Sequence, residues 1–315
     1  MYETKNPVLL IVFNRPEFTK IALESIRNVK PKKLYISCDG KRSSHNDDEN
    51  KIAEVKNILN TVDWDCEVHQ RYLSENRGCK GAVSSAIDWF FSHEEQGIIL
   101  EDDTIPSISF FKFCDEMLSE YKHCDSVLSI SGMNLTEVYY QPDDDYLFSR
   151  TVHVWGWASW RRAWSLYDVS LKNWREWLNA SKLKPKEKIY WKQVFECTEL
   201  NLIPTWDHQW QFAHFKNDGL SIVPKKSLVD NIGFGINSTN TSGCKPDYIS
   251  FNPDHKYTSI EKHPPAIAFD HKYQNIIYKK VLKIGFISTL LIYLRRFPKI
   301  YSIARRLRDQ LNKFK

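Results

Sequence analysis

Short apolar runs alternate with amphipathic stretches of about a dozen residues as far as Ser131, and this rhythm restricts the fold more than any other feature. The run Val8–Phe13 is continuous and apolar, as expected of a strand that is buried on both faces. Pro16 opens a helical stretch and Pro31 ends it, because the residue before a proline avoids helical backbone angles. Such alternation predicts an α/β sheet with helices on its faces. We further expect strands at 33–38, 66–72, 97–100 and 127–131, and helices at 49–60, 81–93 and 107–122.

Polar residues follow three of the expected strands at the point where each strand ends. Asn14 and Arg15 come after the first strand, Asp39 and Gly40 after the second, and three acids after the run 97–100. In open α/β sheets, ligands bind at the carboxyl ends of the strands. The sequence therefore predicts a functional site at this edge of the sheet.

The acidic triplet Glu101-Asp102-Asp103 is the sharpest local feature. Three consecutive carboxylates after a buried strand repel one another unless a cation offsets their charge. A hard divalent ion satisfies this need, because it binds one or two carboxylates together with phosphate oxygens of a substrate. A solvated acidic loop is the alternative interpretation of an isolated triplet.

Several function classes are disfavoured because their motifs are missing. The sequence has no G-x-x-x-x-G-K-[ST] and no G-x-G-x-x-G after a strand, which disfavours P-loop hydrolases and dinucleotide-binding folds. H-E-x-x-H and G-x-S-x-G are also absent, which removes two classes of hydrolase. The seven cysteines are widely spread with no C-x-x-C pair, so we expect neither a zinc knuckle nor a disulfide framework, and a reducing compartment. With 42% hydrophobic residues, the chain is expected to bury a core rather than to be disordered.

Tryptophan is concentrated in one segment, since nine of the 11 Trp residues lie between Trp155 and Trp210. Large aromatic side chains either fill a core or stack on a ligand such as a sugar. We expect about half of this cluster to be core, and Trp155 and Trp157 to face a sugar.

An ordered set of motifs resembles the GT-A-fold nucleotide-sugar glycosyltransferases. It is most similar to the N-acetylglucosaminyltransferase family that starts N-glycan branching, and to bacterial relatives of that family. The resemblance covers about residues 6–240 and leaves the C-terminal tail outside. Its motifs are Pro7-Val8 with Asn14-Arg15, Ser37-Cys38-Asp39-Gly40, Ile99-Leu100-Glu101-Asp102-Asp103, Trp155-Gly156-Trp157 and Trp206-Asp207.

The resemblance implies a GT-A (Rossmann-like) fold with a central mixed sheet, and a role for each matching residue. Asp103 would bind Mn²⁺ (or Mg²⁺) that bridges the diphosphate of a UDP-sugar donor. A loop within 224–240 would fold over the donor, and Asp207 would be the catalytic base. The donor-binding residues implied are Arg15 near the nucleotide, Asp39 at the uracil, Glu101 and Asp102 at ribose or sugar hydroxyls, and Trp155 and Trp157 at the acceptor side of the sugar.

The role of Asp207 agrees with the chemistry of an inverting transfer. One carboxylate must take the proton of the acceptor hydroxyl as that hydroxyl attacks the anomeric carbon. Asp207 lies between Trp206 and Trp210 in the sequence, where burial would raise its pKa. The alternative is a structural carboxylate that pairs with His208 or an arginine.

The C-terminal tail carries the positive charge of the chain. Residues 272–315 hold 12 of the 44 Lys and Arg residues and one acid, Asp309, whereas residues 1–271 carry an excess of acids. Apolar residues interleaved with Lys and Arg are typical of basic amphipathic helices that lie on an anionic membrane surface. A dimerisation helix and a nucleic-acid arm are the alternatives, and the apolar stretch 284–294 argues against nucleic acid.

Together these features predict a catalytic domain over residues 1–270, with a nucleotide-binding half (1–135) and an acceptor half (136–270), followed by a membrane-association tail (271–315). The expected activity is transfer of a sugar from a UDP-sugar to a lipid-linked glycan acceptor. This reaction would belong to the synthesis of surface polysaccharide or lipopolysaccharide. The run Val8–Phe13 is too short for a signal peptide, so we expect a cytoplasmic protein on the inner face of the membrane. A sugar nucleotidyltransferase and a non-catalytic membrane adaptor are the alternative functions.

Overall fold

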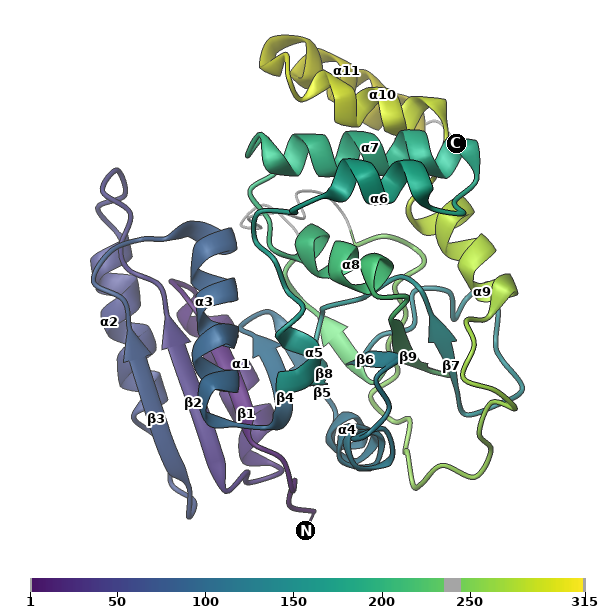
Figure 1. Cartoon of the computed structure of the whole chain (residues 1–315). Coiled ribbons are helices and arrows are strands. Elements are labelled where there is room, and N and C mark those ends of the chain that lie inside the picture. The colour runs from purple at the N-terminus through teal and green to yellow at the C-terminus, as the bar shows by residue number, and fades with distance from the viewer. Residues whose placement is uncertain (1, 235–244, 314–315) are drawn as a thin grey trace.

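The computed structural model describes residues 2–234 and 245–313, and the chain folds around one mixed sheet of eight strands (Figure 1). The strand order is β3-β2-β1-β4-β8-β6-β9-β7, and helices flank the sheet. This arrangement confirms the predicted α/β fold class with its central mixed sheet. The strands are β1 (Val8–Val12), β2 (Lys33–Cys38), β3 (Glu67–Tyr72), β4 (Gln96–Glu101), β6 (Val127–Ser131), β7 (Tyr146–Ser149), β8 (Trp157–Trp160) and β9 (Leu220–Pro224).

Strands β3, β2, β1 and β4 are neighbours and run parallel. Parallel neighbours need crossover connections, and here the helices α1 (Pro16–Arg27), α2 (Asp48–Leu59) and α3 (Gly78–His93) supply them. Every residue of β1 is buried, which explains its unbroken apolar run. Because the four strands point the same way, the polar residues that follow β1, β2 and β4 meet at one edge of the sheet, as predicted.

Strand β8 runs antiparallel between β4 and β6, so the later part of the chain inserts a strand among those of the earlier part. Its register pairs Trp157 with Ile99, which puts the start of β8 beside the carboxyl end of β4. Gly156 precedes β8 with φ of +66°, a left-handed conformation that favours glycine. The predicted halves 1–135 and 136–270 therefore share one sheet and one continuous core.

A second, two-stranded sheet pairs β5 (Thr104–Pro106) with β10 (Val229–Asn231) in antiparallel register. Since β5 begins directly after the acidic triplet, this pairing brings the residues after β10 to the acids. The backbone N–H of Ile232 donates to the carbonyl of Asp103 at 2.9 Å. Sequence analysis predicts neither strand, because pairing across more than a hundred residues leaves no local pattern.

The Trp-rich segment forms much of the remaining core, together with α4 (Ile108–Glu120), α5 (Arg161–Trp164), α6 (Trp174–Ala180), α7 (Pro185–Glu199) and α8 (Asp207–Lys216). More of its Trp residues are core than the predicted half. Those that are at most 5% exposed are Trp157, Trp160, Trp164, Trp174, Trp191, Trp206 and Trp210.

The C-terminal residues fold as helices, as predicted, but they do not form a separate tail from residue 271. They comprise α9 (His271–Ile276), a π-helical turn (Ile277–Val281), α10 (Phe286–Leu294) and α11 (Pro298–Lys313). Tyr273 and Ile277 are fully buried in the main core, and α10 packs along α7 at the top of the view in Figure 1. The boundary at 270/271 is therefore wrong, because it cuts through a packed region. Among the described residues, no helix is long and apolar enough to cross a membrane.

Candidate functional site

A cavity of about 610 Å³ opens at the carboxyl edge of the parallel strands. Its walls come from the ends of β1, β2 and β4, the start of α3, the segment 203–208, and the C-terminal helices. The structure thus brings together nearly all the residues that the sequence singled out. Those that line the cavity are Arg15, Asp39, Glu101, Asp102, Asp103, Trp155 and Asp207.

The acidic triplet is organised around one arginine. Arg15 follows β1, and its Nη1 lies 3.3 Å from Asp102 Oδ1 and 2.9 Å from Asp103 Oδ2. Burial acts to lower the pKa of Arg15, but the attraction of the two carboxylates outweighs burial and raises it. The guanidinium therefore stays charged and offsets part of the negative charge of the triplet.

Burial, together with the remaining negative charge, shifts the pKa values of two of the carboxyl groups. Burial, followed by repulsion from Asp103, Asp102 and Asp207, raises the pKa of Glu101 well above its usual range. Burial also raises the pKa of Asp102 to about 7, although Arg15 opposes that shift. Asp207 lies 106 residues further along the chain than Glu101, yet its charge acts on Glu101. The fold therefore brings the triplet and the predicted base close together. The acids outnumber the one arginine that contacts the triplet, and this excess of negative charge favours the binding of a further cation.

The acids fit a metal ion that is bound together with a substrate. Among the described residues, no three His, Cys, Asp or Glu side chains form a ready-made ligand set. Ions of the Mg²⁺ type do not require one, since one or two carboxylates plus phosphate oxygens suffice. Gly233 leaves room for such a site, because a Cβ at this position would overlap the Asp103 carboxylate. A side chain at residue 233 would therefore displace the predicted metal ligand.

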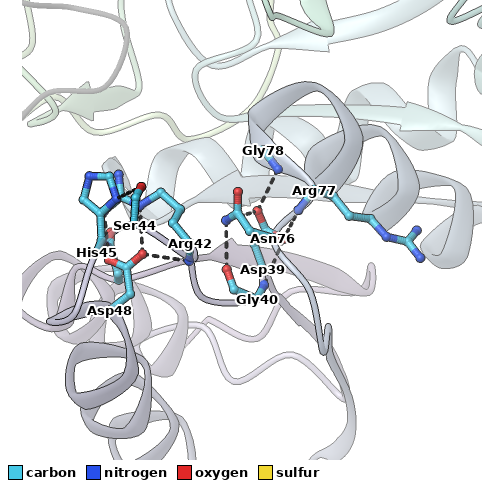
Figure 2. Close-up of polar contacts among 10 residues, drawn as sticks. Asp39, Gly40, Arg42, Ser44, His45, Asp48, Asn76, Arg77 and Gly78 are labelled. Carbon is cyan, nitrogen blue, oxygen red and sulfur yellow. Dashed lines mark hydrogen bonds and ion pairs between the residues drawn. The ribbon is translucent and has the colours of Figure 1, made fainter.

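The Asp39 carboxylate is hydrogen-bonded to neighbouring groups of the protein (Figure 2). Its Oδ1 accepts from the backbone N–H groups of Gly40 and Arg77 at 2.9 Å, and its Oδ2 accepts from Asn76 Nδ2 at 2.9 Å and from the Gly78 N–H at 3.1 Å. A carboxylate offers about four acceptor positions, and these contacts use all of them. The predicted direct contact between Asp39 and uracil therefore finds no acceptor position left. Asp39 instead joins the end of β2 to the start of α3.

A second carboxylate stabilises the neighbouring loop in the same way (Figure 2). Asp48 accepts from Arg42 Nε at 2.8 Å, from the backbone N–H of Arg42 at 3.0 Å and from Asn14 Nδ2 at 2.7 Å. The hydrogen bonds from the Arg42 side chain hold the pKa of Asp48 well below its usual range, although burial opposes the shift. Arg42 is thereby fixed in the cavity wall, and sequence analysis did not single it out.

Asp207 is the first residue of α8, where the helix dipole favours a negative charge. Its carboxylate accepts a hydrogen bond from the hydroxyl of Thr205. Among the described residues, no ion pair is formed between Asp207 and an arginine or histidine. His208 turns to Thr198 instead, with Nδ1 2.8 Å from its Oγ1, and burial lowers the pKa of His208 while Asp207 opposes that shift. Asp207 and His208 therefore do not form the structural pair that was the alternative interpretation.

The two tryptophans that were expected to face a sugar have different surroundings. Trp155 lines the cavity and meets Phe234 edge to face, with ring centroids 5.7 Å apart. Trp157 is 1% exposed in β8 and stacks on Trp206, so it cannot touch a ligand in the cavity. The expectation for Trp157 is corrected, because β8 is a central strand whose side chains fill the core.

Three cavity residues come from the C-terminal helices and were not predicted at the site: Arg295, Tyr301 and Arg305. The two arginines were expected to belong to a membrane-binding tail. Their distance from the motifs along the chain left no signal that they reach the cavity. The loop over 224–240 that was expected to fold over the donor lies partly outside the described residues, since its positions 235–240 are not among them.

Known proteins resemble this chain in structure and not in sequence. No protein-family model matches the sequence, and no curated protein matches it. Solved structures do resemble it: mouse xyloside xylosyltransferase 1 (12% identity, TM-score 0.39, covering 70% of this chain and 84% of that one) and an apo UDP-glucose pyrophosphorylase (10%, 0.37, 73% and 93%). A 4-diphosphocytidyl-2C-methyl-D-erythritol synthase from Anaerococcus prevotii is similar at 14% identity and TM-score 0.32, over 61% of this chain and 83% of that one. These TM-scores all lie below 0.5, so the fold is described from the strands and helices of this chain.

The contacts of Asp39 lead to a prediction about stability. Asp39→Asn removes one acceptor oxygen and turns an NH₂ group toward backbone donors, so we expect a loss of about 3 kcal/mol in the free energy of unfolding. Urea unfolding followed by circular dichroism measures it, with Asp47→Asn, an exposed neighbour without a side-chain cap contact, as the control. Unchanged stability together with lost binding of uridine nucleotides would show that Asp39 serves the ligand directly.

Proposed function

We propose that this protein is an inverting, metal-dependent glycosyltransferase that moves a sugar from a UDP-sugar to a glycan acceptor. One observation carries the proposal. A single cavity at the carboxyl edge of the parallel strands holds both a partly buried acidic triplet and a separate carboxylate, Asp207, at the start of a helix. The triplet would bind a cation together with a diphosphate, and Asp207 would accept a proton. An inverting transfer needs both functions.

The donor binds, in this proposal, along the edge formed by β1, β2 and β4. Asp103 holds Mn²⁺ (or Mg²⁺), while Glu101 and Asp102 contact hydroxyl groups of the ribose or sugar. When bound, the metal ion neutralises the charge that develops on the departing diphosphate. Arg15, which already contacts both aspartates, remains beside the nucleotide. The uracil ring is enclosed by the loop that Asp39 holds in place, and not by the Asp39 carboxylate itself.

Asp207 acts on the acceptor. As the acceptor oxygen attacks the anomeric carbon, its proton passes to a carboxylate oxygen of Asp207. The new glycosidic bond forms on the face opposite the bond to the diphosphate oxygen. That older bond breaks and the diphosphate leaves with the electron pair, so the anomeric configuration inverts. Trp155, in the cavity wall, offers an aromatic surface to the sugar.

Two other functions predict different ligands. A sugar nucleotidyltransferase needs a Gly- and Lys-rich loop after the first strand, and the residues there are Asn14, Arg15 and Pro16. It would bind a nucleoside triphosphate and a sugar phosphate. A non-catalytic adaptor would bind no nucleotide sugar, yet the acids that it would not need are buried at a cost in repulsion.

The C-terminal helices support placement on the inner face of the cell membrane, next to a lipid-linked acceptor of surface polysaccharide synthesis. Apolar side chains that recur with helical spacing are exposed on α10, on α11 and in the turn between them: Phe286, Ile287, Leu290, Tyr293, Phe297, Ile300, Ile303 and Leu307. The same segment carries the excess of Lys and Arg. Apolar residues flanked by cations match the chemistry of an anionic bilayer surface.

Two substitutions separate the proposed roles of the carboxylates. Asp103→Asn should weaken Mn²⁺-dependent binding of UDP by at least about tenfold, because a charged ligand of the metal is lost. Asp207→Asn should keep that binding within about twofold and lower turnover by about 100-fold or more, because the base is lost. Calorimetry measures binding and UDP release measures turnover, with Asp254→Asn, an exposed acid, as the control. Normal turnover by Asp207→Asn would refute the assignment of the base.

A vesicle experiment tests the proposed location. The protein should sediment with phosphatidylglycerol vesicles and not with phosphatidylcholine vesicles. Phe286→Ser with Ile287→Ser, on α10, should reduce bound protein by about fivefold, because the apolar contact is lost. The control pair is Ile189→Ser with Leu200→Ser, which are exposed near α7. Equal losses for both pairs, or no binding by the unmodified protein, would contradict membrane association.

A further inference from the structure

The C-terminal helices form part of the wall of the candidate active site. Arg295 lies at the end of α10, and Tyr301 and Arg305 lie on α11, and all three line the cavity that holds the acidic triplet and Asp207. In Figure 1 these two helices form the outermost layer above α7. A segment whose composition indicates membrane binding thus also reaches the site of reaction.

Contacts around the turn between the two helices hold these side chains in place. The Arg295 guanidinium carbon lies 4.9 Å from the centroid of the Tyr301 ring, which joins α10 to α11. The next residue, Arg296, pairs with Glu196 of α7 at 2.7 Å and donates to Gln193 at 3.0 Å. Since Arg296 fixes the turn to α7, Arg295 is presented to the cavity from a packed support.

Arg295 lies on the side of the cavity where the acceptor would bind. Burial is the main cause of the lowered pKa of His208, and the positive charge of Arg295 adds to it. His208 follows Asp207 directly in α8. The nucleotide edge is built from other residues, the Asp39 and Asn76 loops and the start of α3. Among the described residues, no carboxylate forms an ion pair with Arg295. Arg295 therefore adds a positive charge to the wall of the cavity that also holds the proposed base.

Two arginines at this position select an anionic group. The planar guanidinium donates paired hydrogen bonds that match phosphate geometry, and Arg is weakly hydrated compared with Lys. A neutral glycan acceptor would gain little from two cations in the wall of this cavity. An acceptor that carries a phosphate near its sugar would be attracted by the arginines and held away from the acidic triplet.

We propose that Arg295 and Arg305, with Tyr301 as support for Arg295, form a subsite for a phosphate or diphosphate group of the acceptor. The inference rests on the proposed function, which supplies the donor and the base. The acceptor class that follows is a glycan joined to its carrier through phosphate. The exposed apolar face of α10 and α11 would lie next to the carrier, so the same helices would contact the lipid and its phosphate.

The test compares two charge-matched double variants. Arg295→Gln with Arg305→Gln removes two cavity cations, whereas Lys299→Gln with Arg306→Gln removes two exposed cations from the same segment. The probes are n-octyl phosphate below its micelle concentration and inorganic phosphate, each titrated calorimetrically in metal-free buffer. UDP with Mn²⁺ is titrated separately and reports on the donor site.

We expect the cavity variant to bind octyl phosphate at least about tenfold more weakly, and the exposed variant to bind it within about twofold of the unmodified protein. Tighter binding of octyl phosphate than of inorganic phosphate would show that the apolar chain also contacts the protein. Intact UDP and Mn²⁺ binding in both variants would show that they are folded.

Three outcomes would overturn the subsite. Equal losses in both double variants would indicate general charge attraction, and no loss in the cavity variant would show that the arginines do not bind phosphate. A parallel loss of UDP and Mn²⁺ binding in the cavity variant alone would assign the arginines to the donor. Failure of the unmodified protein to bind UDP with Mn²⁺ refutes the proposed donor instead, while the octyl phosphate result still reports on the arginines.

Discussion

The rest of the site depends on a cluster of four acids in one cavity, of which Asp102 is buried and Glu101, Asp103 and Asp207 are partly buried. Burial and like charge raise the pKa of Glu101 and Asp102, and a single arginine, Arg15, contacts two of the acids. Such a cluster lowers the stability of a protein, and its presence in a cavity is therefore a sign of a ligand site. It lies at the carboxyl edge of the parallel strands, in the wall of a large cavity, and there it supports the proposed binding of a cation and a diphosphate.

Carboxylates at the same edge have two distinct tasks, which their hydrogen bonds separate. Asp39 and Asp48 accept several hydrogen bonds each and fix the loops after β1 and β2. Asp207 accepts a hydrogen bond from Thr205 and otherwise faces the cavity. An acid that is saturated by the protein builds the site, whereas an acid with spare acceptor positions is available for substrate. The sequence alone does not distinguish these two cases, since each aspartate follows a strand or begins a helix.

Local pattern was sufficient for the parallel half of the fold. The predicted ranges 33–38 and 127–131 coincide with β2 and β6, and the polar ends of the strands meet as expected. Prediction failed where contacts join distant residues: β8 enters the sheet between β4 and β6, which buries Trp157, and Tyr273 is buried in the core beyond the expected domain boundary. Arg295 reaches the cavity for the same reason. Periodicity reports which face of a segment is apolar, but it does not report which partner covers that face.

The most direct test of the account is a calorimetric titration of the purified protein with a panel of nucleotide sugars, with and without Mn²⁺. The account predicts that a UDP-sugar binds and that its binding requires the metal, because the diphosphate must be held against the acidic triplet. Binding of a nucleoside triphosphate and a sugar phosphate in place of a nucleotide sugar would indicate a nucleotidyltransferase. No binding in either condition would contradict the central claim and favour a non-catalytic protein.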